Sequence, residues 1–121
     1  MDSLPILEFE SCEVLRAWLE EHHDTSQGMW LRIYKKNSGI RSVTFEQVLD
    51  EGLCFGWSES MRRSHDTTSY LQRFTPRKSA GTRSARNLAR AKALIEQGRM
   101  KPAGLSMLGL KQEREEEQQN D

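Results

Sequence analysis

Residues 43–57 read VTFEQVLDEGLCFGW, and this stretch holds the clearest local folding signals in the chain. Thr44 followed by Gln47 three residues later forms a capping box, and Val43 stands where it can pack onto Val48 in the first helical turn. Apolar residues then recur at helical spacing up to the glycine before the last tryptophan. The stretch predicts a helix capped by Thr44 and a strand directly after it.

Upstream of this helix, the chain shows three further elements. Ser11 can cap a helix that reaches about residue 23, because apolar side chains recur there at spacings of three and four. Residues 29–36 alternate between aliphatic and more polar or aromatic side chains, which is typical of a strand. Residues 6–9 follow Pro5 and fit an edge strand, since proline cannot donate a sheet hydrogen bond.

Downstream, the pattern predicts a hairpin and two more helices. Residues 56–63 and 68–75 alternate as two strands, with Trp57 and Met61 expected on one face of the first. A third helix is expected to end at Gly98, because glycine readily adopts the left-handed conformation of a helix C-cap. A short fourth helix follows a proline a few residues later.

These elements predict an α+β fold. We expect a small, mainly antiparallel sheet of about three or four strands, with about four helices packed mostly on one face. The length of 121 residues suits one domain, which we place at residues 1–111. Residues 112–121 contain no apolar side chain, so we expect an acidic, disordered tail there.

Charge is balanced overall but not along the chain. Residues 1–60 carry 5 basic and 11 acidic side chains, residues 61–101 carry 11 basic and 2 acidic, and residues 102–121 carry 2 basic and 5 acidic. Such an asymmetry creates a local field that attracts anions to the middle block. The partner expected from charge alone is an anionic small molecule or an acidic protein surface.

The cysteines and the chain ends bear on compartment and cofactors. Cys12 and Cys54 are far apart in sequence and lack the paired spacing of a zinc or thiol-exchange site, so we expect no metal and no cofactor. The N-terminus has no basic leader and no apolar run is long enough to cross a bilayer. We therefore expect a cytoplasmic protein without a membrane span, and its oligomeric state stays open.

Several short motifs occur in order between residues 9 and 110. They are WL at 30–31, KKxSG at 35–39, LCFGW at 53–57, FTPR at 74–77 and GRMxPAG at 98–104. In this order they resemble the YdeI/OmpD-associated, or bacteriocin-protection, family. The resemblance implies a bacterial protein linked to tolerance of cationic antimicrobial peptides and to envelope stress, with no agreed catalytic activity. The chain departs from the family pattern at Ser58-Glu59, where members carry an apolar residue and Asp, and at Arg83, where members carry Trp.

The main candidate site is a basic junction between the last strand and the third helix. Helical spacing places Arg83, Arg86 and Arg90 on one face, and a helix N-terminus there could receive an anion. The candidate ligand-binding residues are Arg73, Arg77, Lys78, Arg83, Ser84, Arg86, Asn87, Arg90, Trp57 and Glu59. Lys35 and Lys36 could extend this surface or could protect a sheet edge from aggregation. A solvated basic face explains the same charges and is the more common arrangement for a run of charged residues.

A second hypothesis is single-stranded nucleic-acid binding. Aromatic side chains lie on the predicted strands among basic residues, as a stacking platform requires. They are Trp30, Tyr34, Trp57, Tyr70 and Phe74. Core packing is the competing explanation, since a small protein needs most of its aromatic side chains inside.

A third hypothesis is an enzyme that uses Cys54 or Glu59. The apolar neighbours of Cys54 favour an inert buried thiol, and a cross-strand ion pair of Glu59 with Arg63 or Arg73 is expected instead of a catalytic role. Residues 98–104 form either a binding loop or a connector, and Arg99 is its candidate binding residue. We therefore expect a non-enzymatic binding protein.

Overall fold

The computed structural model describes residues 3–77 and 85–109, which form one β-sheet and four α-helices. Three predicted site residues, Lys78, Arg83 and Ser84, lie outside the described residues, as do the tail and the domain boundary at residue 111. The elements are β1 (Ile6–Glu8), α1 (Cys12–His22), β2 (Met29–Tyr34), the 3-10 turn η1 (Lys36–Ser38), α2 (Phe45–Phe55), β3 (Trp57–Ser64), β4 (Ser69–Pro76), α3 (Ala85–Glu96) and α4 (Pro102–Met107).

The four strands form one mixed sheet in the order β1-β2-β4-β3. β1 is an edge strand, as the proline before it predicts, and it runs parallel to β2 because α1 carries the chain back across the sheet. β2 pairs antiparallel with β4, and β3 and β4 form the predicted hairpin. The α+β fold class is therefore confirmed.

The capping signals operate as the sequence predicts. The Thr44 hydroxyl accepts a hydrogen bond from the Gln47 backbone N–H at 3.2 Å, and the Gln47 side chain accepts one from the Thr44 N–H at 3.0 Å. The Ser11 hydroxyl caps α1 by accepting from the Val14 N–H at 3.3 Å. Gly98 follows α3 with φ +72°, the conformation expected of its C-cap.

A bulge in β3 overturns one expectation of the strand pattern. Glu59 pairs with Phe74 and Arg62 with Gln72, so β3 holds one more residue than β4 between these pairs. Beyond the bulge every side chain of β3 changes face relative to simple alternation. Trp57 is buried, whereas Met61 is 60% exposed, so the two do not share a buried face.

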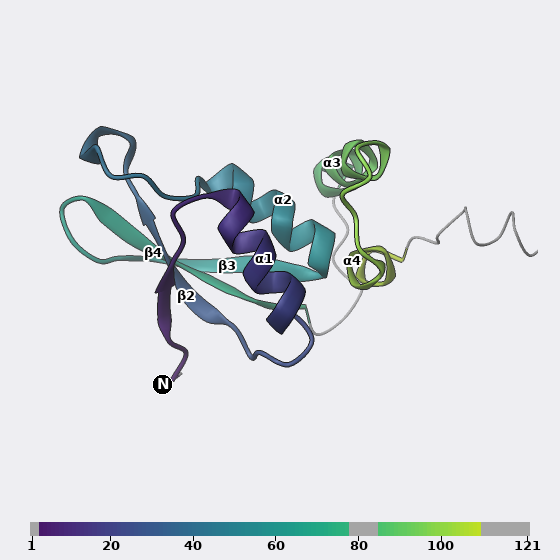
Figure 1. Cartoon of the computed structure of the whole chain (residues 1–121), viewed down its shortest axis with the longest axis horizontal. Helices are drawn as coiled ribbons and strands as arrows, with labels where there is room; N and C mark the ends of the chain where they lie inside the picture. Colours follow the sequence, from purple (N-terminus) through teal and green to yellow (C-terminus); the bar gives the residue numbers. More distant parts are fainter. Residues whose placement is uncertain (1–2, 78–84, 110–121) are drawn as a thin grey trace, which may run out of the picture.

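The core lies between the sheet and two of the helices. Figure 1 shows α1 and α2 lying across one face of the sheet, while α3 and α4 lie beside α2, beyond the end of the sheet. Only α1 and α2 thus fit the expectation that the helices pack mostly on one sheet face, because α3 and α4 pack mainly against α2. The buried side chains around α2 are Leu15, Leu19, Met29, Leu31, Val48, Leu53, Phe55, Trp57, Phe74, Ala91, Leu94 and Leu108.

Among residues 3–77 and 85–109, no helix is both long enough and apolar enough to cross a bilayer.

The contact between α2 and α4 depends on a glycine. A Cβ atom on Gly104 would overlap the carbonyl oxygens of Leu53 and Cys54, and backbone atoms cannot move aside cheaply. We expect Gly104→Ala to lower the free energy of unfolding by about 2 kcal/mol or more, the usual cost of overpacking a core. Urea denaturation followed by circular dichroism measures this change.

Gly98→Ala is the control for this prediction. A Cβ at Gly98 meets nothing within 4 Å, so only its positive φ opposes the substitution. We expect a loss of about 1 kcal/mol there. If Gly104→Ala proves no more costly than Gly98→Ala, α4 does not pack on α2 as closely as described.

Candidate functional site

Among the described residues of the predicted basic junction, the charged groups do not form one free surface. The Arg90 guanidinium binds the Asp50 carboxylate at 2.6 Å and so joins α3 to α2. Arg86 is exposed on α3, Asn87 is half-buried, and Arg77 is half-buried with its backbone N–H bonded to the Gly56 carbonyl at 2.9 Å. At least one arginine of the predicted site therefore holds helices together.

Trp57 does not offer its ring to a ligand. It is 1% exposed, its indole N–H donates to the His23 carbonyl at 3.1 Å, and its ring lies 5.0 Å from that of Phe74. Its placement in the predicted ligand site was wrong because the strand face that carries it is the one covered by α1 and α2.

Glu59 does not form the expected cross-strand ion pairs. It lies opposite Phe74, on the sheet face that the helices cover. Arg63 lies opposite Leu71 and Arg73 opposite Trp30, on the other face of the sheet. The bulge between Glu59 and Arg62 causes this separation, since without it Glu59 and Arg63 would share a face.

The five aromatic side chains of the stacking hypothesis divide between the two faces of the sheet. Trp57 and Phe74 belong to the buried core, and Tyr70 lies on the helix-covered face beneath the Arg62 guanidinium, at 4.3 Å. Trp30 and Tyr34 lie on the opposite face. A platform made of all five rings was therefore wrong, and on the opposite face Tyr34 is half-buried while Trp30 is buried.

We call this opposite side the open sheet face, because the described helices lie on the other side of the sheet or beyond its end (Figure 1). Strand alternation and register place on it Trp30, Arg32, Tyr34, Arg63, Leu71 and Arg73. Two guanidinium groups stack on its rings, Arg63 over Trp30 at 4.6 Å and Arg32 over Tyr34 at 4.5 Å. Trp30 itself is 4% exposed.

Arg32 is held in place by its neighbours on this face. Its guanidinium binds the Asp66 carboxylate at 2.7 Å and the Glu8 carboxylate at 3.4 Å, and its Nε donates to the Ser69 hydroxyl at 2.9 Å. Because two carboxylates neutralise it, Arg32 mainly positions the hairpin turn and the Tyr34 ring.

Arg63 is more available to a ligand. Its side chain is exposed, and no carboxylate of the described residues forms an ion pair with it. Lys35 lies near the same end of the sheet, since its N–H donates to the Thr68 carbonyl at 2.8 Å. Antiparallel pairing of β2 and β4 places Lys35 and Lys36 at the opposite end of the sheet from Arg77, so they do not extend the predicted junction.

A buried carboxylate, which sequence reasoning missed, connects three parts of the fold. Glu51 is fully buried on α2 and binds Arg16 of α1 at 2.8 Å and Arg99 of the α3–α4 loop at 2.6 Å. Arg16 also donates to the Arg99 carbonyl at 2.7 Å. The signal available in the sequence was an acid within the apolar part of α2, three residues after Val48.

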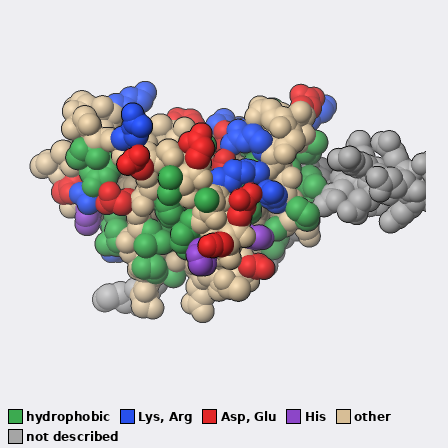
Figure 2. Space-filling model, in the orientation of Figure 1, with side chains coloured by type: hydrophobic (Ala, Val, Ile, Leu, Met, Phe, Trp, Pro, Cys, Tyr) green, Lys and Arg blue, Asp and Glu red, His purple; other side chains and the backbone are tan. Residues whose placement is uncertain are grey.

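On the molecular surface, Figure 2 shows Lys and Arg side chains gathered between α2 and the last two helices, with Asp and Glu side chains beside them.

Cys54 lies close to this cluster and is poorly suited to nucleophilic catalysis. Burial raises the pKa of its thiol, with a smaller opposing effect from a hydrogen bond to Arg16. A raised pKa lowers the fraction of reactive thiolate at neutral pH. Both cysteines are free thiols.

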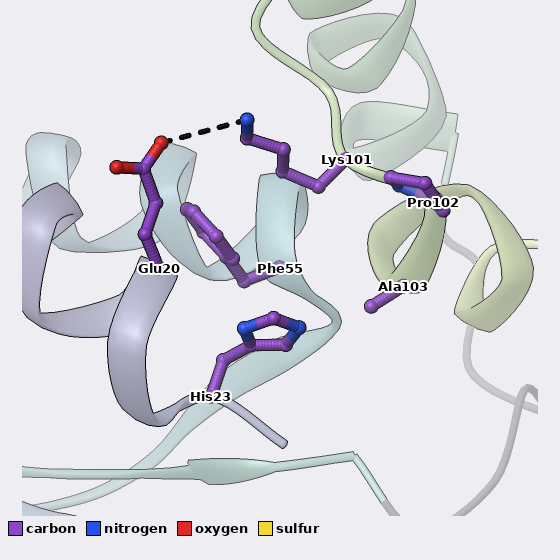
Figure 3. A pocket seen from close by; sticks show the side chains of 6 residues that line it. All are labelled: Glu20, His23, Phe55, Lys101, Pro102 and Ala103. Carbon is purple, nitrogen blue, oxygen red and sulfur yellow. Dashed lines mark ion pairs between the residues drawn. The ribbon is translucent and has the colours of Figure 1, made fainter.

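The loop at residues 98–104 forms one wall of a pocket. Lys101, Pro102 and Ala103 line it together with Glu20 and His23 at the end of α1 and Phe55 at the end of α2, around about 430 Å³ (Figure 3). Arg99 does not line this pocket, because its guanidinium binds Glu51. The loop is thus a connector at Arg99 and a pocket wall at Lys101, which caps α4, and at the first two residues of α4.

The buried position of Glu51 leads to a stability prediction. In Glu51→Gln the two arginines lose their shared negative partner, and breaking a buried ion pair costs about 3 kcal/mol or more. Asp50→Asn is the matched control, since the Arg90–Asp50 pair is partly exposed and such pairs contribute about 1 kcal/mol or less. Equal urea midpoints for the two variants would contradict a central role for Glu51.

The hairpin turn leads to a prediction about titration. Hydrogen bonds from the Ser69 hydroxyl and from Thr68 to Asp66 hold the pKa of that carboxyl well below its ordinary value of about 3.9. The ionised form is therefore favoured by folding, and this stability is lost as the pH falls below that value toward the folded-state pKa. We expect Ser69→Ala to raise the Asp66 pKa, measured by NMR titration of the side-chain carboxyl carbon.

Ser60→Ala is the control for this titration. Ser60 is exposed in the bulge of β3 and should leave the Asp66 curve unchanged. An unchanged curve in Ser69→Ala would mean that the Ser69 hydroxyl does not stabilise the carboxylate.

Comparisons with known proteins bear on the family of the chain. No curated protein and no solved structure matches it. These comparisons do not link it to the YdeI/OmpD-associated family, so that resemblance remains an expectation. The model of a family described as "Domain of unknown function (DUF8412)" matches residues 7–107, from β1 through α4. Since this match spans most of the 121 residues, the chain belongs to the DUF8412 family.

Proposed function

We propose that this protein is a non-enzymatic binding protein whose open sheet face takes an anionic ligand with planar rings, and that single-stranded nucleic acid is the class that fits this face best. The observation that carries the proposal is the Arg63–Trp30 stack. The Arg63 side chain is exposed, lies 4.6 Å from the Trp30 ring centre and has no ion-pair partner among the described carboxylates.

A stacked guanidinium suits two parts of a nucleotide. Bases stack on arginine planes as well as on aromatic rings, and the same group donates in pairs to a phosphate. Trp30 orients the guanidinium of Arg63 before a ligand arrives, which reduces the entropy lost on binding.

The arrangement is repeated along the same strand. Tyr34 and Arg32 form a second ring–guanidinium stack at the far end of β2. Trp30 and Tyr34 are four residues apart on the same strand face, which is about 13 Å along the strand, so the two stacks follow one another along β2. A ligand with successive rings and charges, such as a nucleic-acid strand, can contact both.

Charge at this end of the sheet favours a polyanion. Lys35 and Lys36 are exposed beyond the end of β2, near the hairpin turn, and Arg63 is exposed on β3. The acidic groups facing this region, Glu8 and Asp66, are engaged by Arg32.

The wider role implied by the YdeI/OmpD-associated resemblance belongs to the same proposal. A basic face repels cationic peptides, so a contribution to peptide tolerance or stress resistance would pass through an anionic partner. We place the protein in the cytoplasm, where its free thiols stay reduced.

Binding of a short single-stranded oligonucleotide tests the proposal. We expect amide shifts in β2 and β3 and an affinity that falls as salt rises, because phosphate binding releases counterions. Arg63→Ala should weaken binding about fivefold or more, the effect of losing one stacking contact. Arg63→Lys keeps the positive charge but lacks the planar guanidinium, so its affinity should lie between that of Arg63→Ala and that of the wild type.

Arg86→Ala is the matched control, since Arg86 is an exposed arginine of the predicted basic junction but lies on α3. It should bind as the wild type does. If Arg86→Ala weakens binding and Arg63→Ala does not, the junction rather than the open sheet face is the binding surface. Absence of binding at low salt would refute the proposal.

A further inference from the structure

The pocket beside α4 is built from three elements that are far apart in sequence. Figure 3 shows the His23 ring below the Phe55 ring, Ala103 and Pro102 across from them, and Lys101 reaching over toward Glu20. Its volume of about 430 Å³ lies within the range of small-molecule sites. It is separate from the open sheet face, since none of its lining residues lies on a strand.

A hydrogen bond, close backbone contacts and an ion pair fix the walls of this pocket. The Lys101 backbone N–H donates to the Cys54 carbonyl at 3.0 Å, next to the wall residue Phe55. Gly56 and Gly104 allow α4 to lie directly on the end of α2, where Cβ atoms would collide with backbone. Arg99, two residues before Lys101, is bound to the buried Glu51. The pocket therefore exists before any ligand arrives.

The inner walls favour a flat ring. The rings of Phe55 and His23 have centres 5.2 Å apart and are tilted by 56°, and Pro102 and Ala103 supply aliphatic surface opposite. His23 Nδ1 lies 2.8 Å from the Leu19 carbonyl oxygen, which can only accept, so Nδ1 carries the proton. This bond fixes the orientation of the imidazole as a wall.

The rim carries one weak ion pair that a ligand anion can displace. The Lys101 ammonium lies 3.5 Å from the Glu20 carboxylate, and with 39% and 51% of these side chains exposed the pair is weak. An incoming carboxylate can therefore compete for the ammonium. Behind the Phe55 ring, at 5.2 Å from its centre, stands Arg16, which shares a single buried carboxylate with Arg99. The cluster behind the wall thus has an excess of positive charge.

We propose that this pocket binds a small aromatic monocarboxylate. Its ring would lie with Phe55 and His23 on one side and Ala103 on the other, and its carboxylate would bind the Lys101 ammonium. One ammonium at the rim matches one carboxylate. The inference goes beyond the proposed function and depends on different residues.

Phenylacetate and its neutral amide, phenylacetamide, provide the test. Titrated into the labelled 121-residue chain, phenylacetate should shift the amides of the pocket residues and saturate with a Kd on the order of 1 mM, the affinity expected of a ligand of this size. Phenylacetamide should bind about tenfold more weakly, because it lacks the negatively charged carboxylate that pairs with the Lys101 ammonium. Shifts confined to other regions, or none that saturate, would overturn the proposal.

Variants at the rim and wall make the test specific. Lys101→Gln should abolish the preference for the acid over the amide, whereas Lys101→Arg should keep it. Ala103→Leu should fill the pocket and weaken both compounds. If Lys101→Gln binds phenylacetate as tightly as the wild type, the assigned site is wrong. Oligonucleotide binding by these variants should stay unchanged, which separates this test from that of the open sheet face.

Discussion

The Glu51 carboxylate, buried between Arg16 and Arg99, is the constraint around which the helical half of this protein is arranged. A buried charge without a partner is very costly, whereas a paired one is tolerated. Glu51 therefore requires α1 and the α3–α4 loop to deliver their guanidinium groups to the same point beside α2. Such a pair contributes little net stability compared with apolar packing, but it strongly disfavours other arrangements of these elements. The pocket beside α4 is a consequence, because the same loop forms its wall.

Arginine has distinct roles in different parts of this molecule. Around α2, Arg16, Arg99 and Arg90 are bound by carboxylates and serve to join helices. On the open sheet face, Arg63 stacks on a ring and stays exposed. The same side chain thus supports packing where it meets acids and recognition where it does not. Net charge along the sequence cannot separate these roles, since it counts every arginine equally.

The candidate site was less predictable than the fold. Capping boxes, glycine stops and alternation act within a few residues, which is why α1, α2 and the hairpin were found where predicted. One bulge in β3 placed Arg63 on the opposite face of the sheet from Glu59, and no local signal marked it. Trp57 was misplaced for a related reason, since its strand pattern does not say which face the helices cover.

Local chemistry in the chain was enough to specify the elements, their ends, the α+β class and the segregation of charge, because each follows from spacing between near neighbours. Which arginines form ion pairs with carboxylates, and which do not, depends on packing between segments far apart in the sequence. Asp50 and Glu51 lie far in sequence from Arg90 and Arg99, and their pairing was visible only once α2 met α3 and the following loop. Ion pairs and sheet faces depend on contacts between distant segments, and these contacts form only when the whole chain has folded.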